Sequence, residues 1–248
     1  MVNGAGAAGI SCSELYITAG AKRENFLMCD SKGVIHDGRT DLNPEKKRFA
    51  VKTDKRTLAD ALVGADVFLG LSVGNCLTKE MVRSMNSGAI IFAMANPTPE
   101  IFPADALEAG AAVVGTGRTD FPNQINNVLG FPGIFRGALD VRATDVNEAM
   151  KLAAAEALTE IAAAKVDPET YAALKLAYAK DAAAGMFDGD APLALNYVIP
   201  KPFDPRVVPH VARKVAEAAM KTGMARVAIP DLDAYEKSVK ERIKRANS

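Results

Sequence analysis

The chain has 248 residues, of which 24% are charged, and its 30 basic and 30 acidic side chains leave a formal net charge of zero. This balance argues against a general attraction to nucleic acid or membrane surfaces. The longest apolar runs fall far below the roughly 18–20 residues of a membrane helix, and the N-terminus lacks the pattern of a signal peptide. Cys12, Cys29 and Cys76 form no C-x-x-C pair, which predicts reduced thiols in a cytoplasmic protein.

The chain opens MVNGAGAAGI, in which Gly4, Gly6 and Gly9 have the spacing G-x-G-x-x-G. This spacing is typical of the turn between a buried strand and a helix in dinucleotide-binding domains. Gly4 would allow the tight turn, Gly6 the close approach of a pyrophosphate, and Gly9 the packing of the helix on the strand. Only residues 1–3 precede the loop, so we expect the first strand to be largely missing.

The run NFLMCD predicts a second strand that ends at Asp30. An acid at this place binds the ribose hydroxyls in dinucleotide-binding domains, although an aspartate before SKG also suits a turn. The acid favours NAD, because it would repel the 2′-phosphate of NADP. Lys32, Arg39, Lys46 and Lys47 follow closely and either neutralise such a phosphate or form a solvated basic stretch. The choice between NAD and NADP therefore stays open.

Helices and short apolar strands alternate over the next part of the chain. We expect helices over 56–65, 78–86 and 103–110, and strands over 66–72, 89–96 and 112–117. Such alternation predicts an α/β fold, a Rossmann-type doubly wound parallel sheet buried on both faces.

After about residue 144 the sequence becomes helical and rich in alanine. Helices are expected over 145–165, 168–184, 205–222 and 231–246. We therefore expect an N-terminally truncated NAD(P)-binding domain over 1–165 and a helical C-terminal extension over 166–248 that packs on it.

Three asparagines follow the predicted strands, where open parallel sheets bind ligands. Asn96 leaves a strand in AMANPTPEI, and Asn126 and Asn127 precede an apolar helix. Their amides can donate to a carboxylate or position a carboxamide. From spacing alone, a turn residue at Asn96 and a helix cap at Asn126 or Asn127 are the preferred interpretations.

Several segments together resemble bacterial malic enzymes over nearly the whole chain. They are VNGAGAAGI, D-x-x-G after the second strand, L-A-D-A-L-x-G-A-D-V-F-x-G-L-S, F-A-M-A-N-P-T-P-E, N-N-V-L-G-F-P-G-I-F-R-G-A-L-D-V-R-A and Y-V-I-P-K-P-F-D-P-R. The resemblance implies the dinucleotide-binding domain and C-terminal helices of a metal-dependent oxidoreductase. That family decarboxylates malate oxidatively to pyruvate and CO₂ with NAD or NADP and Mg²⁺ or Mn²⁺.

The resemblance also implies roles for individual residues. The implied cofactor contacts are Gly4, Gly6, Ala7, Ala8, Gly9, Asp30, Ser72, Val73 and Asn96, and the implied substrate contacts are Asn96, Asn126 and Asn127. In the family, the base lysine, the acid tyrosine and the metal-binding carboxylates lie upstream of the glycine loop. None has a matching position in residues 1–248, so we assign no catalytic or metal residue and expect little turnover from this chain alone.

Two other interpretations share part of this pattern. A non-catalytic dinucleotide-binding or assembly module would share the glycine loop without the chemistry. Another Rossmann-type dehydrogenase is disfavoured by the run N-N-V-L-G-F-P-G. The C-terminal helix is amphipathic, with Tyr235, Val239 and Ile243 four residues apart, and family members often assemble. We therefore expect a homo-oligomer or a partner that supplies the upstream half.

Overall fold

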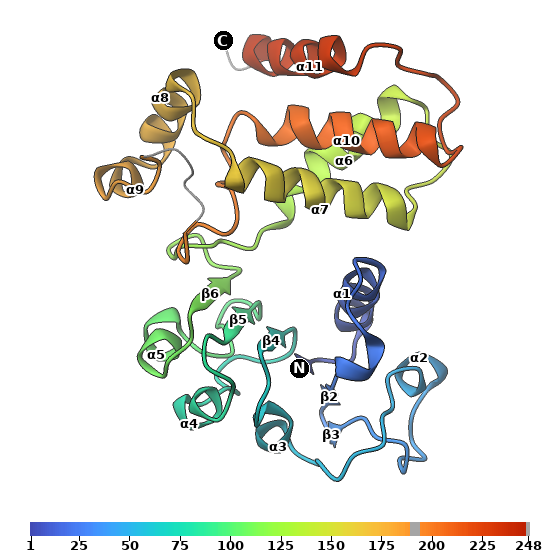
Figure 1. Ribbon diagram of the computed structural model, residues 1–248, viewed down its shortest axis with the longest axis vertical. Coiled ribbons are helices and arrows are strands. Elements are labelled where there is room, and N and C mark those ends of the chain that lie inside the picture. The colour runs from blue at the N-terminus through green and yellow to red at the C-terminus, as the bar shows by residue number, and fades with distance from the viewer. Residues whose placement is uncertain (189–193, 247–248) are drawn as a thin grey trace. The chain divides into compact units, whose positions relative to one another are not determined.

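The computed structural model describes residues 1–188 and 194–246, shown in Figure 1. Residues 189–193 and 247–248, which belong to the predicted helical extension, lie outside the described residues. The chain divides into two compact units, Met1–Ile125 and Asn126–Ser248. The domain boundary predicted at residue 165 falls inside the second unit, directly after one of its helices, and stays a prediction.

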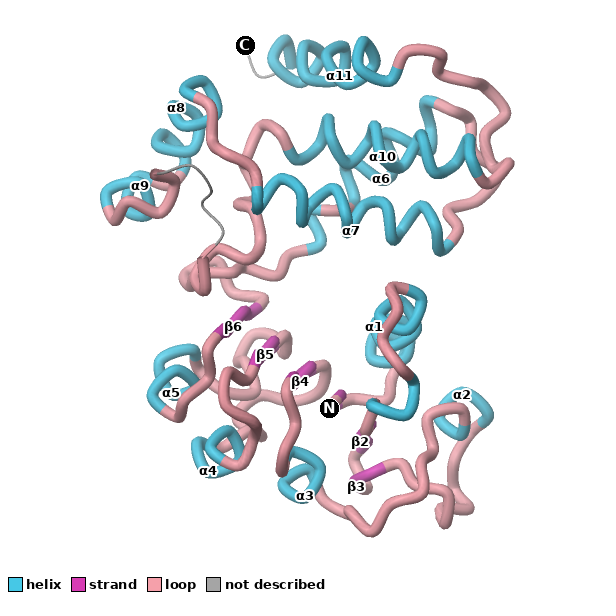
Figure 2. Tube along the Cα trace, in the orientation of Figure 1, coloured by secondary structure: helices cyan, strands magenta, loops and turns pink. Residues whose placement is uncertain are grey.

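The first unit contains a six-stranded sheet in the order β3-β2-β1-β4-β5-β6. All neighbouring strands are parallel except β3, which pairs antiparallel with β2. Figure 2 shows β4, β5 and β6 side by side, with loops joining them to the helices. The strands are β1 Val2–Asn3, β2 Met28–Asp30, β3 Gly33–Val34, β4 Val67–Gly70, β5 Ile90–Ala93 and β6 Val113–Thr116. The predicted Rossmann-type sheet is confirmed.

Helices cover both faces of this sheet, as a doubly wound fold requires. Figure 1 shows α3, α4 and α5 beside the strands. Leu62, Val82 and Ala106 of these helices share one buried cluster with Phe68 and Ile91 of the sheet. On the other face, α1 packs its apolar side against a second cluster around β1 and β2. The helices are α1 Ala7–Thr18, α2 Pro44–Lys47, α3 Leu58–Leu62, α4 Lys79–Arg83 and α5 Pro103–Glu108, with a 3-10 turn at Arg23–Asn25.

The central strand β1 has only two residues, whereas β4, β5 and β6 have four each. It nevertheless pairs on both sides. Val2 donates its N–H to the Leu27 carbonyl at 2.8 Å, and Leu69 donates to the Met1 carbonyl at 2.9 Å. The Met1 ammonium donates to the Val67 carbonyl at 2.9 Å, and burial lowers the pKa of this amine to about 6. The first strand is thus short, as expected, but it fills the centre of the sheet.

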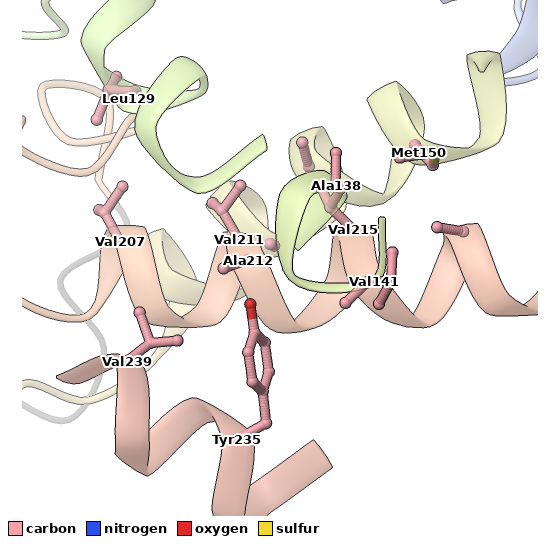
Figure 3. Close-up of a cluster of buried hydrophobic side chains, with 14 of the residues drawn as sticks. Leu129, Ala138, Val141, Met150, Val207, Val211, Ala212, Val215, Tyr235 and Val239 are labelled. Atoms are coloured by element: carbon pink, nitrogen blue, oxygen red, sulfur yellow. The ribbon is translucent and has the colours of Figure 1, made fainter. Parts of the chain in front are cut away.

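The second unit is built from helices around one apolar core. Val207, Val211 and Val215 of α10 meet Tyr235 and Val239 of α11 on one side, with further residues from α6 and α7, as Figure 3 shows. Tyr235 donates its hydroxyl to Asp140 at 2.8 Å. The helices are α6 Phe131–Asp140, α7 Glu148–Ala163, α8 Pro168–Ala177, α9 Ala179–Ala183, α10 Val207–Lys221 and α11 Leu232–Ala246, with a 3-10 turn at Asn127–Leu129.

Two glycines four residues apart let α6 and α10 approach closely. A Cβ at Gly133 would lie 2.6 Å from the Val211 Cβ, and a Cβ at Gly137 would overlap the Ala212 carbonyl oxygen. Because that oxygen belongs to a helix backbone, it cannot move without shifting α10. The pairing of these helices therefore depends on the absence of side chains at both positions.

We predict that Gly137→Ala destabilises the second unit despite the better helix propensity of alanine. Overpacking costs about 1–3 kcal/mol, which exceeds the roughly 1 kcal/mol that replacing a helical glycine gains. Gly130→Ala is the matched control, since its Cβ would lie at an ordinary 3.4 Å from Ile134. Urea denaturation measures both variants, and equal midpoints for Gly137→Ala and Gly130→Ala would contradict the prediction.

Candidate functional site

The carboxyl ends of the parallel strands meet at one edge of the sheet in the first unit. Between β1 and β4 the strand order changes direction, and open α/β sheets bind ligands at such a crevice. The structure brings the predicted cofactor residues of this unit to that edge. They are Gly4, Gly6, Ala7, Ala8 and Gly9 after β1, Asp30 at the end of β2, Ser72 and Val73 after β4, and Asn96 after β5.

The three glycines of the loop meet different surroundings. Gly4 has a φ of 120°, and a Cβ there would overlap the Leu71 carbonyl oxygen. A Cβ at Gly9 would overlap the carbonyl oxygen of Gly4. In contrast, a Cβ at Gly6 would meet no atom within 4 Å, and Gly6 and the two residues after it are exposed. Gly4 therefore lets the turn pass close to the segment after β4, and Gly9 lets α1 pack on that turn. Gly6 borders open space.

The exposed N-terminus of α1 fits an anionic group. This helix of 12 residues has Gly6 as its N-cap, and among the described residues no side chain caps it and no acid stands in its first turn. The first N–H groups of a helix lack partners within the helix and carry a partial positive charge. Together with the space beside Gly6, they form the kind of cradle that holds a pyrophosphate.

Uncharged side chains border the crevice on the segment after β4 and at the end of β1. Asn3, at the end of β1, donates its side-chain N–H to Ser72 Oγ at 2.7 Å and to Cys76 Sγ at 3.3 Å. Burial raises the pKa of the Cys76 thiol, so this group stays protonated at neutral pH. Val73 is 66% exposed beside them. Ser72, Val73 and Cys76 therefore offer polar and apolar contacts to a ligand but no charged group.

Glu100 is the buried carboxyl group that joins two loops of this edge. Its side chain is fully buried and accepts hydrogen bonds from the Ser72 N–H at 3.2 Å and the Ala95 N–H at 3.0 Å. A Cβ at Gly70 would overlap the Glu100 carboxyl group, so glycine at the end of β4 makes room for it. Glu100 thus fixes where the loops after β4 and β5 leave the sheet.

Asn96 lies in the loop that follows β5, next to Gly117 in the loop that follows β6. Its amide donates to the Met94 carbonyl at 3.3 Å, and a Cβ at Gly117 would lie 2.8 Å from the Asn96 nitrogen. Arg118 donates to the Pro97 carbonyl at 3.3 Å and pairs with Asp120 at 2.8 Å. Asn96 itself is exposed. Its amide therefore stands at the open edge, where the predicted contact with cofactor or substrate remains sterically possible.

Asp30 ends β2 next to the glycine loop, since the Cys29 carbonyl accepts the Gly4 N–H at 2.9 Å. Arg39 binds its carboxylate through two N–H groups at 2.8 and 3.0 Å, and Lys46 binds it at 2.8 Å. Burial acts to raise the pKa of Asp30, but these hydrogen bonds outweigh it and hold the pKa well below the ordinary value. Asp30 is therefore ionised and already paired with two cations.

Asn126 and Asn127 lie in the second unit. Asn126 is the N-cap of the 3-10 turn, where its side chain accepts the Val128 N–H at 3.0 Å. This cap matches the interpretation that spacing alone favoured. Asn127 is exposed in the first position of the turn. Their contact with substrate stays a prediction.

Sequence reasoning missed Asn3, Glu100 and Arg118 as members of this edge. Asn3 and Glu100 lie inside the segments MVNGAGAAGI and F-A-M-A-N-P-T-P-E, yet neither position alone indicates a buried partner. Arg118 follows β6 in the same way that Asn96 follows β5, which was the usable signal.

A cavity of about 450 Å³ lies at the opposite, amino-terminal edge of the same sheet. It is bordered by Met1, Leu27, Lys55 and Val67, together with Tyr16 at the end of α1. Because parallel sheets place ligands at the carboxyl ends of their strands, this cavity is unrelated to the site described above.

A sheet of this order with an open glycine loop defines a Rossmann-type dinucleotide-binding protein. Comparison with known proteins narrows this class, since a family model described as "Malic enzyme, NAD binding domain" matches residues 1–176. The chain belongs to the malic enzyme family and carries its NAD-binding domain. The resemblance inferred from the sequence is therefore confirmed.

Curated relatives and solved structures agree with this family. The chain is 53% identical to the NADP-dependent malic enzyme of Rhizobium meliloti strain 1021, covering 97% of the chain and 30% of the relative. It is 49% identical to the bifunctional malic/malolactic enzyme of Bacillus subtilis strain 168, and the match covers 97% of the chain and 53% of that relative. The crystal structure of Entamoeba histolytica malic enzyme superposes with a TM-score of 0.81 at 36% identity. The match covers 99% of this chain and 47% of that enzyme's chain. The chain thus spans between about a third and a half of these proteins.

We predict that Gly6→Val weakens dinucleotide binding without changing stability, whereas Gly9→Val lowers the stability of the fold. A Cβ at Gly6 would meet no atom within 4 Å, so the melting temperature of Gly6→Val should change little. The added side chain would block the close approach of a pyrophosphate, so dinucleotide affinity should fall at least about tenfold. Valine at Gly9 overlaps the loop and should lower the melting temperature. Unchanged affinity in Gly6→Val would show that the ligand lies elsewhere.

We also predict that Glu100→Ala lowers the free energy of unfolding by about 1–3 kcal/mol for each N–H that loses its acceptor. Glu100→Gln should cost less, since one carbonyl oxygen remains. Glu24→Ala, an exposed site in the same unit, is the control and should change stability by less than about 0.5 kcal/mol. Chemical denaturation followed by circular dichroism provides the comparison, and a Glu100→Ala protein as stable as the control would refute the role assigned to Glu100.

Proposed function

We propose that this chain is the NAD(P)-binding part of a malic enzyme, which decarboxylates malate oxidatively to pyruvate and CO₂. The observation that carries the proposal is the open space at Gly6 beside the uncapped N-terminus of α1. The names of the curated relatives support it, because most of those most similar to this chain are called NADP-dependent malic enzymes.

The residues of the first unit would bind and orient the dinucleotide. When bound, the nicotinamide supplies the hydride acceptor for oxidation of the malate hydroxyl carbon. The glycine loop would hold the pyrophosphate, and Ser72 and Val73 would border the crevice. Asn96 would donate its amide hydrogen bonds at the open edge, to the nicotinamide carboxamide or to a malate carboxylate. Asn126 and Asn127 stay candidate malate contacts from the second unit.

The metal implied by the resemblance, Mg²⁺ or Mn²⁺, does not fit the described residues. Among residues 1–188 and 194–246, no group of three or more His, Cys, Asp or Glu side chains is placed to hold a metal ion. We therefore derive no step through a metal. We propose that the base, the acid and the metal ligands are supplied from outside residues 1–248, so that this chain alone contributes cofactor binding rather than turnover.

A non-catalytic dinucleotide-binding or assembly module is the second candidate. Exposed apolar side chains support an association role. Phe131, Phe135 and Leu139, four residues apart on α6, are 51%, 55% and 66% exposed. We propose assembly into a homo-oligomer, or with a polypeptide that supplies the catalytic half, in the cytoplasm. Among the residues described by the structure, no helix is long and apolar enough to span a membrane.

We predict that the purified chain binds one dinucleotide per molecule and produces no NAD(P)H from malate and Mn²⁺. Titration calorimetry measures the binding, and absorbance at the reduced-nicotinamide band measures turnover. Binding without turnover supports the proposed division of roles. Turnover by the chain alone would contradict the external origin of the base and metal ligands, whereas absence of binding would refute the proposed function itself.

A further inference from the structure

The cavity at the amino-terminal edge of the sheet lies between the two strands that flank β1. Its volume is about 450 Å³, and it is bordered by Leu27, directly before β2, and by Val67, the first residue of β4. Met1, directly before β1, borders it as well. Because β1 has two residues and β4 has four, the cavity occupies the place into which a longer central strand would extend.

Two backbone N–H groups point into this gap. The Leu27 carbonyl accepts the Val2 N–H at 2.8 Å. On the other side, the Val67 carbonyl accepts the Met1 ammonium at 2.9 Å. The N–H and C=O of one strand residue point toward the same neighbouring strand, so the N–H groups of Leu27 and Val67 both point toward the gap. In the described part of the chain no backbone acceptor is found for the Leu27 N–H, so an extended segment could pair there.

The Met1 ammonium carries a positive charge where the cavity meets β1. It donates to the Val67 carbonyl, although an ammonium has three N–H donors, and no carboxylate of the described residues pairs with it. The titratable groups that act on it from the surrounding segments are Cys29, Asp66 and Lys55, and burial lowers its pKa to about 6. A carboxylate bound in the cavity would therefore stabilise the charged amine.

The walls of the cavity are largely apolar on both faces of the sheet. Tyr16 of α1 and Phe26 border it on one face, whereas Ala61 of α3 and Val63 border it on the other. Successive side chains of a strand point to opposite faces, so the residues of an extended segment would contact the two walls in turn. The cavity thus suits a short run of apolar residues.

We propose that this cavity binds the carboxyl-terminal end of a separate polypeptide, an extended apolar segment that lies between β2 and β4. A segment that continues β1 runs parallel to both strands, so its terminal carboxylate lies against the Met1 ammonium and the Leu27 N–H. Such strand addition combines main-chain hydrogen bonds with pockets for alternate side chains. The inference rests on the proposed function only for the identity of the partner, the polypeptide that supplies the catalytic half.

The experiment is titration calorimetry of the full chain with the peptide acetyl-Ser-Val-Val-Val, which has a free carboxyl end. We expect a Kd below about 1 mM at about pH 5.5. The same peptide with an amidated end should bind at least about fivefold more weakly, because it loses the charge-assisted contact with the amine. Acetyl-Ser-Val-Asp-Val should not bind measurably, because it would place an unpaired charge against an apolar wall.

The affinity for the free-acid peptide should also depend on pH. The peptide carboxylate favours the charged amine, so binding raises the pKa of Met1 above its value of about 6 in the free chain. Affinity should therefore fall by at least about threefold between about pH 5.5 and about pH 7.5, as the amine of the free chain loses its proton. The amidated peptide should show no such loss, and an equal pH dependence of both peptides would contradict the contact with Met1.

Two exposed apolar residues provide matched variants. Val63 borders the cavity and is 58% exposed, whereas Leu107 of α5 is 53% exposed and does not border it. Val63→Asp and Leu107→Asp introduce the same charge at exposed positions, and melting temperatures confirm that both variants are folded. Val63→Asp should weaken binding of acetyl-Ser-Val-Val-Val at least about fivefold, and Leu107→Asp less than about twofold. Equal affinities would show that the peptide does not lie in the cavity.

The possible failures are distinguishable. A parallel titration with NADP⁺ tests the proposed function at the opposite edge of the sheet. If the chain binds NADP⁺ but not acetyl-Ser-Val-Val-Val, the dinucleotide site stands and this inference is overturned. If the peptide binds and NADP⁺ does not, the strand site stands and the proposed function fails. Equal binding of the free-acid and amidated peptides at about pH 5.5 would overturn the role of the terminal carboxylate.

Discussion

The first unit depends on a backbone contact that excludes side chains at the end of β1. Gly9 in the first turns of α1 lies against the carbonyl oxygen of Gly4, and Gly4 lies against Leu71 after β4. Three segments therefore meet with no room for a Cβ at either glycine. This contact directs the N-terminus of α1 toward the carboxyl edge of the sheet, so the packing of the fold and the opening of the crevice have the same cause.

Much of the fold could be predicted because its apolar strands are buried on both faces. The runs around Phe68, Ile91 and Val114 are nearly continuous in apolar residues, and all three side chains lie in one core cluster. The predicted strand over 25–30 was longer than β2, since Arg23–Asn25 form a 3-10 turn. Phe26 also packs against the core without joining the ladder, and a pattern of burial cannot separate these two situations.

The site was predictable only where one short segment forms it. Glycine spacing works because Gly4, Gly6 and Gly9 share a single turn, whose sterics are local. Glu100 could not be found this way, because it meets the Ser72 N–H across 28 residues of sequence. The antiparallel strand β3 was missed for a related reason. It has two residues, Gly33–Val34, and it is defined by its pairing with β2 rather than by its own pattern.

Asp30 shows why a motif residue does not settle the charge of a site. The rule that an acid at the end of the second strand favours NAD considers one carboxylate, yet the field at the ribose position is the sum over its neighbours. Lys46, 16 residues further along, and Arg39 reach the same carboxylate. Because the Asp30 and Arg39 side chains are only 7% and 10% exposed, the ion pair between them is screened little by salt. The segment that follows β3 therefore supplies the cations that compensate the charge of Asp30.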